Sequence, residues 1–202
     1  MLGSRSLTIE HGDNLQHWSW TSVPGSRLVC LCTRVCAHTY RVDGLAFYQS
    51  NCSSAFFCRY PENAKLEEVC SLDIKGEIST KSLSQNTTYG VYFVFKLMHT
   101  DCTGFERVPV KVSVSEVHES GYRPIADKSV YLKPQEESPE GLPRPTERGD
   151  GWMEVEMGTY RVGVDDDGVR EKVVLETSVR QTEILNWKTD LLVQGIELRP
   201  LD

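Results

Sequence analysis

The sequence lacks a long hydrophobic run and lacks an apolar segment near its start. No stretch reaches the roughly 20 apolar residues that a membrane-spanning helix needs. The opening "MLGSRSLTIEHGD" contains no h-region of a secretory signal, so we expect no export and no disulfides. These absences argue against a membrane protein and against a secreted, disulfide-stapled domain.

Positive charge is also scarce. Lysine and arginine together number 22 against 29 acidic residues, which gives a net charge of −7. Nucleic-acid binding and binding to anionic lipid both depend on Lys and Arg. We therefore expect neither a nucleic acid nor a membrane as partner.

Alternation with a period of two dominates the sequence, and helix signals are few. Val108–Val117 places four valines on one face, and Thr88–Met98 is apolar almost throughout, as in a strand buried on both faces. The best helix signal is Tyr60–Cys70, with Pro61 in its first turn. The pattern predicts one all-β domain over residues 1–202, a β-sandwich or jelly roll with one short helix. The expected strands are 6–10, 71–78, 88–98, 108–117, 128–134, 151–158, 172–177 and 191–200.

Several long motifs are more specific than this periodicity. In order along the chain they read "SLTIEHGDNLQHWSW", "LDIKGEISTKSLSQNTTYGVYFVFKL", "GFERVPVKVSV", "ERGDGWMEVEMG" and "NWKTDLLVQGIELRP". Together they resemble the plant phloem protein 2 family, the tobacco-agglutinin-like (Nictaba-like) lectin domain, over residues 2–27 and 60–202. The resemblance implies a non-catalytic β-sandwich lectin of the cytoplasm and nucleus. Its implied ligands are N-acetylglucosamine oligomers and N-glycan cores.

The resemblance also implies a sugar site of two N-terminal tryptophans and two C-terminal glutamates. Trp18 and Glu176 match two of these positions, whereas His11 and Val169 occupy the other two. Glu171 lies two residues from Val169, on the same strand face. We therefore predict that carbohydrate contacts Trp18, Glu176, His11 and Glu171.

The chemistry of such a site can be stated without the family. An indole ring covers the apolar C–H face of a pyranose, and carboxylates accept strong hydrogen bonds from its hydroxyl groups. The other tryptophans, Trp20, Trp152 and Trp187, are interpreted as core residues because most buried tryptophans serve packing.

Five of the seven cysteines lie between Cys30 and Cys58, inside a segment (28–59) that we expect to match nothing in the family. Zinc is one explanation, with ligands drawn from the cysteines and His38, although the spacing is not a standard one. Disulfides are a second explanation, which the missing signal peptide disfavours. A retained intron is the third and the one we favour, so we expect no metal or other cofactor.

Codon choice can be used to examine the intron hypothesis. Arg27-Leu28 can be encoded AGG-TTR, which contains a splice donor, and Phe56–Arg59 can be TTY-TTY-TGC-AGR, a pyrimidine tract ending in an acceptor. Both cuts then fall after the second base of an arginine codon. Splicing would restore "SVPGSRYPENAKLEEV", the junction typical of the family. We interpret 28–59 as an insert without regular structure of its own.

The expected partners follow from the resemblance. Glycans or glycoproteins are the leading partners, and a homodimer is left open. Many members of the family carry an F-box that docks on a ubiquitin ligase, but no such segment precedes the domain in this sequence, so a ligase partner is not favoured. The alternative function is a protein-interaction or substrate-recognition module that has lost its F-box. Hydrolysis by a carboxylate pair such as Asp150 and Glu154 is disfavoured, because the acids alternate along a strand.

Overall fold

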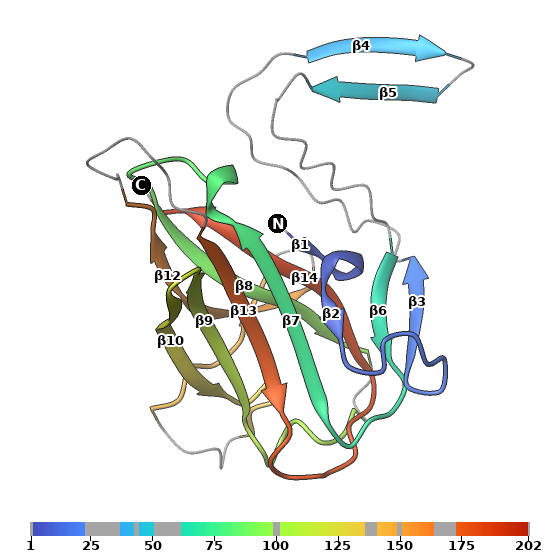
Figure 1. The fold of residues 1–202 in the computed structure, drawn as a ribbon. Helices are drawn as coiled ribbons and strands as arrows, with labels where there is room; N and C mark the ends of the chain where they lie inside the picture. The colour runs from blue at the N-terminus through green and yellow to red at the C-terminus, as the bar shows by residue number, and fades with distance from the viewer. Residues whose placement is uncertain are drawn as a thin grey trace.

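The computed structural model is a β-sandwich of two antiparallel sheets (Figure 1). It describes residues 2–22, 37–42, 45–50, 62–98, 102–135, 141–148, 151–163 and 173–201. Helical structure within these ranges is confined to two short 3-10 turns, η1 (Ser4–Ser6) and η2 (Thr80–Ser82). The all-β sandwich prediction is confirmed. None of the helical segments described is long or apolar enough to cross a membrane.

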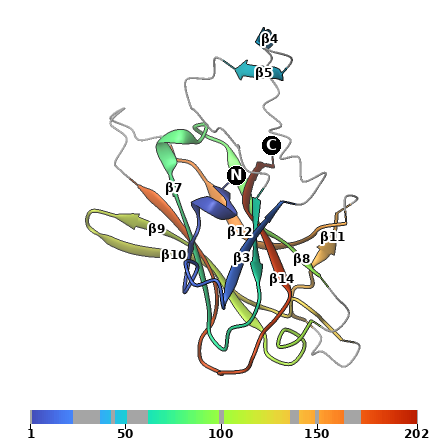
Figure 2. The ribbon, with the colours of Figure 1, turned by 90° about the vertical axis from the view of Figure 1, so that its right-hand side faces the viewer.

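The two sheets face each other as two layers (Figure 2). The larger sheet has the order β11-β12-β8-β14-β6-β3, with β1 also paired to β14, and the smaller one has the order β10-β9-β13-β7-β2. The strands of the larger sheet are β1 (Leu2–Gly3), β3 (Trp18–Ser22), β6 (Glu62–Leu66), β8 (Thr88–Leu97), β11 (Thr146–Glu147), β12 (Met153–Arg161) and β14 (Leu191–Pro200). Those of the smaller sheet are β2 (Thr8–Ile9), β7 (Leu72–Ser79), β9 (Val110–His118), β10 (Gly121–Val130) and β13 (Val174–Gln181).

The last two strands of the chain occupy central positions. β14 pairs with β8 and β6 inside the larger sheet, and β13 pairs with β9 and β7 inside the smaller one. Both sheets are therefore assembled from strands that are far apart in the sequence.

The core fills the space between the two sheets. The alternation seen in the sequence points Val110, Val112 and Val114 of β9 inward, and all three are fully buried. Phe93 and Phe95 of β8 stack against each other with ring centroids 5.4 Å apart. Burial of each large apolar side chain contributes about 1.5–3 kcal/mol, so this layer holds the sheets together.

The predicted helix at Tyr60–Cys70 is wrong. Residues 62–66 form strand β6, which pairs with β3 on one side and β14 on the other. Ala64 and Leu66 are fully buried while Lys65 between them is half-buried, which is the period of a strand. Strand pairing and burial override the local helix signals, whose contribution per residue is below about 1 kcal/mol.

The segment 28–59 falls within a single strand-to-strand connection. Ser22 at the end of β3 is directly paired with Glu62 at the start of β6, so the two ends of this connection are neighbours. Inside it, β4 (Ala37–Val42) pairs with β5 (Leu45–Ser50), which corrects the expectation that the insert has no regular structure. The cysteines of the insert lie outside the described residues, and its origin as an intron remains a prediction.

A buried lysine links two loops at the end of the sandwich where β13 connects to β14. Lys188 is fully buried, and its Nζ donates to the carbonyl oxygens of Cys70 and Asn186, both at 2.9 Å. Its backbone exchanges two hydrogen bonds with Val69. Burial lowers the pKa of Lys188 from 10.5 to about 8, an effect that the nearby Cys70 partly opposes.

Deletion of residues 28–59 is predicted to leave the sandwich intact. The connection between Ser22 and Glu62 would shorten from 39 to 7 residues, which is still enough for a turn between paired strands. The smaller loop-closure entropy predicts an unchanged free energy of unfolding, or a gain of up to about 1.5 kcal/mol. Urea denaturation followed by circular dichroism measures this. A shortened protein without a cooperative transition would contradict the prediction.

Stability is predicted to rise with pH between about 8 and 10 because of Lys188. The folded pKa is lowered to about 8 from 10.5, so the unfolded chain binds the proton more tightly across this window. The expected contribution of Lys188 is about 3 kcal/mol at most. Above pH 9 the buried Cys102 thiol opposes it, because burial raises the pKa of this thiol to about 11. Urea denaturation at pH 7, 8.5 and 10 measures it. The rise should vanish in Lys188→Met and persist in the half-exposed control Lys75→Met, and an equal rise in all three proteins would refute the assignment.

Candidate functional site

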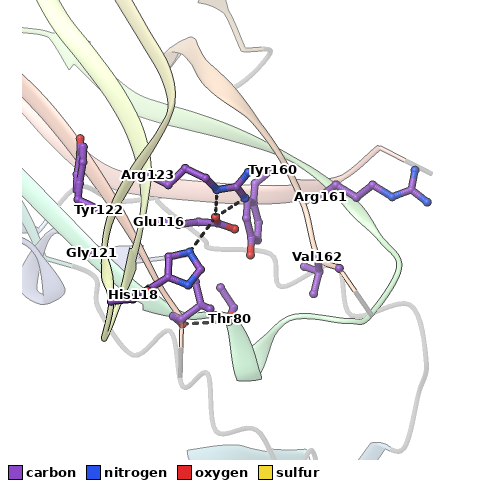
Figure 3. A pocket seen from close by; sticks show the side chains of 12 residues that line it. Thr80, Glu116, His118, Gly121, Tyr122, Arg123, Tyr160, Arg161 and Val162 are labelled. Carbon is purple, nitrogen blue, oxygen red and sulfur yellow. Dashed lines mark hydrogen bonds and ion pairs between the residues drawn. The ribbon is translucent and has the colours of Figure 1, made fainter. Parts of the chain in front are cut away.

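A cavity of about 660 Å³ opens at one end of the sandwich, between the β9–β10 hairpin and the end of β12. We call it the end pocket. Figure 3 shows four of its side chains converging, from Glu116, His118, Arg123 and Tyr160. Val162 and other residues complete the lining. A volume of this size lies within the range of small-molecule sites, about 300–1,000 Å³.

The polar wall of the end pocket is an extension of the core. Residues 110, 112 and 114 of β9 point inward as valines, and the same alternation carries Glu116 and His118 inward where the strand runs past the apolar layer. Arg123 of β10 is the direct cross-strand partner of Glu116. Two neighbouring strands therefore deliver a carboxylate, an imidazole and a guanidinium to one place.

Glu116 is the central group of the pocket. Its side chain is only 6% exposed, and its Oε2 accepts a hydrogen bond from Arg123 Nε at 2.5 Å and lies 3.2 Å from His118 Nε2. Burial by itself would raise the pKa of Glu116, but hydrogen bonds from Arg123, His118 and Tyr160 outweigh it and lower the pKa below its usual value. The group is thus an ionised acceptor at neutral pH.

The two sheets approach each other closely where β10 and β12 leave the pocket region. A Cβ added at Gly158 of β12 would lie 2.6 Å from the Cβ of Ala126 on β10, so no larger residue fits there without movement. A register shift interrupts each of these strands at this level, between Pro124 and Ala126 and between Glu156 and Gly158. Such irregularities redirect the side chains beyond them, which here include Arg123 and Tyr160.

The opposite wall of the pocket is less polar. Val162 is 5% exposed. The hydroxyl group of Thr80 in η2 donates a hydrogen bond to the Val173 carbonyl oxygen at 3.0 Å. Gly163 and Val173 also line the pocket, and they flank residues 164–172, which lie outside the described ranges. The pocket therefore presents hydrogen-bonding groups on one side and mainly aliphatic carbon on the other.

The four predicted carbohydrate-binding residues are dispersed. Trp18 belongs to the core and is 1% exposed, so neither face of its indole is open to a sugar in this structure. His11 is exposed in the turn after β2, with its ring 5.3 Å from that of His17. Glu176 is half-buried on the outer face of the smaller sheet. Glu171 falls among the residues that the structure does not describe.

Strand geometry keeps His11 away from Glu176. The turn that carries His11 begins at Glu10, whose N–H donates to Asp73 on β7, while Glu176 is paired with Glu77 on the same strand. Four residues along a strand correspond to about 13 Å. The structure thus does not bring the predicted residues together, and their roles remain predictions.

The interpretation of the other tryptophans is partly correct. Trp152 is buried against Val94 and Leu192, as expected for a core residue. Trp20 is partly buried, with the Arg5 guanidinium 3.7 Å above its ring centre. The assignment of Trp187 to the core is wrong, because the connection between β13 and β14 leaves it 60% exposed.

Sequence reasoning missed the residues of the end pocket. The signal was present in "VKVSVSEVH", where acidic and histidine side chains take the inward positions that valines hold earlier in the strand. A polar residue at an expected core position is informative because burying it unpaired is costly. Within the described ranges, no three His, Cys, Asp or Glu side chains are grouped so that they could hold a metal ion.

Comparisons with known proteins agree with the motif resemblance. The F-box protein PP2-B10 of Arabidopsis thaliana is 30% identical over 200 residues, which cover 99% of this chain and 59% of that protein. The F-box protein PP2-B1 of the same plant is 30% identical over 242 residues, covering 99% and 62% respectively. This chain therefore spans about 60% of the length of these relatives.

Solved structures offer only a remote likeness. The CBM22-1 xylan-binding domain from Paenibacillus barcinonensis Xyn10C aligns with a TM-score of 0.35 at 10% identity, covering 91% of this chain and 86% of that domain. A score this low adds nothing to the strand pairing described above. The model of the Phloem protein 2 family, by contrast, matches residues 48–200. The chain belongs to the phloem protein 2 family.

Proposed function

We propose that this protein binds carbohydrate without catalysis, and that the end pocket holds a sugar residue. The observation that carries the proposal is the ionised, buried Glu116 in an open cavity, with donors on its own side and the carbon of Val162 on the other. A pyranose has the matching asymmetry, since its hydroxyl groups donate to a carboxylate while its C–H face packs on apolar carbon.

The proposed ligands and compartments rest on the family resemblance. N-acetylglucosamine oligomers or N-glycan cores are the proposed ligands, and the cytoplasm and nucleus are the proposed compartments. A non-catalytic role agrees with the state of Glu154, one acid of the disfavoured hydrolytic pair. Its Oε2 lies 2.5 Å from Arg199 and 3.6 Å from Arg148, so the carboxylate is engaged in ion pairs with two arginines.

Glu116→Gln is predicted to weaken sugar binding. The substitution keeps the shape of the side chain but removes the charge that sugar hydroxyl groups would bond, so we expect affinity to fall at least about tenfold. A glycan array followed by titration calorimetry measures this. His118→Gln serves as a second pocket variant, and Glu147→Gln, an exposed acid on β11, is the matched control.

The same assay can distinguish the end pocket from the predicted residues. His11→Ala, Trp18→Phe, Glu171→Gln and Glu176→Gln are compared with the pocket variants. Loss of binding in Glu116→Gln and His118→Gln supports the pocket. Sugar binding that survives both pocket variants but is lost in the His11 and Glu171 variants would place the ligand elsewhere.

A second candidate function is protein recognition, as in a substrate-recognition module. The relatives named above are F-box proteins, and one loop of this chain has the character of a protein contact. Ile184, Leu185 and Trp187 are 55%, 70% and 60% exposed. Asn186 between them accepts from Gln181 Nε2 and donates to the Gly104 carbonyl, so the loop is held in place. Rigid exposed aromatic groups are frequent centres of interfaces.

The two candidate functions predict opposite responses to deglycosylation. A defined N-glycoprotein is tested for binding before and after enzymatic removal of its glycans. Sugar recognition predicts that binding is lost on deglycosylation and is unaffected in Ile184→Ser/Leu185→Ser/Trp187→Ser. Protein recognition through the loop predicts that binding persists after deglycosylation and falls at least about tenfold in the triple variant. Surface plasmon resonance measures both.

A further inference from the structure

An apolar row crosses the outer face of the smaller sheet beside the mouth of the end pocket. Tyr122 of β10 is paired with Val117 of β9, which is paired in turn with Val174 of β13. Tyr122 is 59% exposed, and both valines are half-buried. Neighbouring strands lie about 4.8 Å apart, so the row extends over about 10 Å. A pyranose ring can lie flat on a surface of this width.

Tyr122 connects this row to the end pocket. It lines the pocket mouth, and Figure 3 shows its ring directed away from the cluster around Glu116. The next residue, Arg123, points inward to Glu116, as strand alternation requires. Two adjacent residues of the edge strand β10 therefore point in opposite directions. Arg123 contacts the pocket interior, and Tyr122 lies on the outer face of the sheet.

Two carboxylates border the row on its far side from the pocket. Glu176 of β13 and Glu77 of β7 are directly opposite each other in the register. Among the residues described, neither carboxylate has a hydrogen-bond or ion-pair partner. Like charges at directly opposed positions destabilise a sheet. This unfavourable pair lies on the same outer face as the exposed Tyr122 ring, with Glu176 two strands away from it. A carboxylate and an aromatic ring at this separation can serve the hydroxyl groups of one sugar unit and the C–H face of the next.

We propose that Tyr122, Val117, Val174 and Glu176 form a second sugar subsite, the outer shelf. An oligosaccharide that enters the end pocket continues across Tyr122 and hydrogen-bonds Glu176. The oligomers already proposed as ligands would then extend over both the end pocket and the outer shelf. The proposal rests on the proposed function, and it gives Glu176 a place in the site that does not involve Trp18.

The test is the dependence of affinity on ligand length, measured by titration calorimetry with N-acetylglucosamine and its dimer, trimer and tetramer. The wild-type protein is expected to bind the trimer at least about tenfold more tightly than the monomer, because the added rings gain stacking on Tyr122 and bonds to Glu176. Tyr122→Ala, Glu176→Gln and Val117→Glu should each bring this ratio close to one. Tyr122→Trp should preserve it, and Asp127→Asn, elsewhere on the same outer face, is the control.

The outcomes separate the shelf from the proposed function. Binding of all four ligands with no gain in affinity with length overturns the shelf and leaves the end pocket standing. A gain that survives in the three shelf variants also overturns it. Failure of the wild-type protein to bind any ligand of the series overturns the N-acetylglucosamine proposal and the shelf together. Glu116→Gln is expected to weaken the monomer and the trimer alike, whereas a shelf variant changes their ratio.

Discussion

The candidate site depends on the requirement that a buried carboxylate be fully paired. Glu116 is removed from water, and an unpaired charge there would cost several kcal/mol. Its partners come from three places: His118 near the end of its own strand, Arg123 on β10, and Tyr160 on β12 of the opposing sheet. Satisfying one charge therefore ties the two sheets together at the mouth of the cavity and fixes the positions of His118, Arg123 and Tyr160.

At the opposite end of the sandwich a buried cation, Lys188, must also be paired. Lys188 loses its water but gains carbonyl acceptors from two separate segments, at Cys70 and Asn186. It terminates the apolar layer and holds the connection that carries Trp187. Interior charges thus mark both limits of the core. They differ in their surroundings, because the lysine is enclosed by backbone whereas the glutamate borders a cavity of about 660 Å³.

Alternation in the sequence was sufficient to predict the sandwich and most of its long strands, since half-buried strands display their two faces directly. It failed at β6, where five residues carried helix-like signals and only pairing with β3 and β14 decides the structure. The site was less predictable. A motif identifies Trp18 but does not say which way its ring points, and β3 turns it into the core. Glu116 and Arg123 become a site only through cross-strand register, which a single sequence does not specify.

The central placement of β13 and β14 has a consequence for how the protein is made. During synthesis β7, β8 and β9 leave the ribosome before the strands that pair with them in the middle of each sheet. Until residues 174–200 have emerged, these strands expose open edges that invite pairing with other chains. Folding of this domain is thus completed only after residues 174–200 have been translated, and a premature stop before Val174 removes the central strands of both sheets.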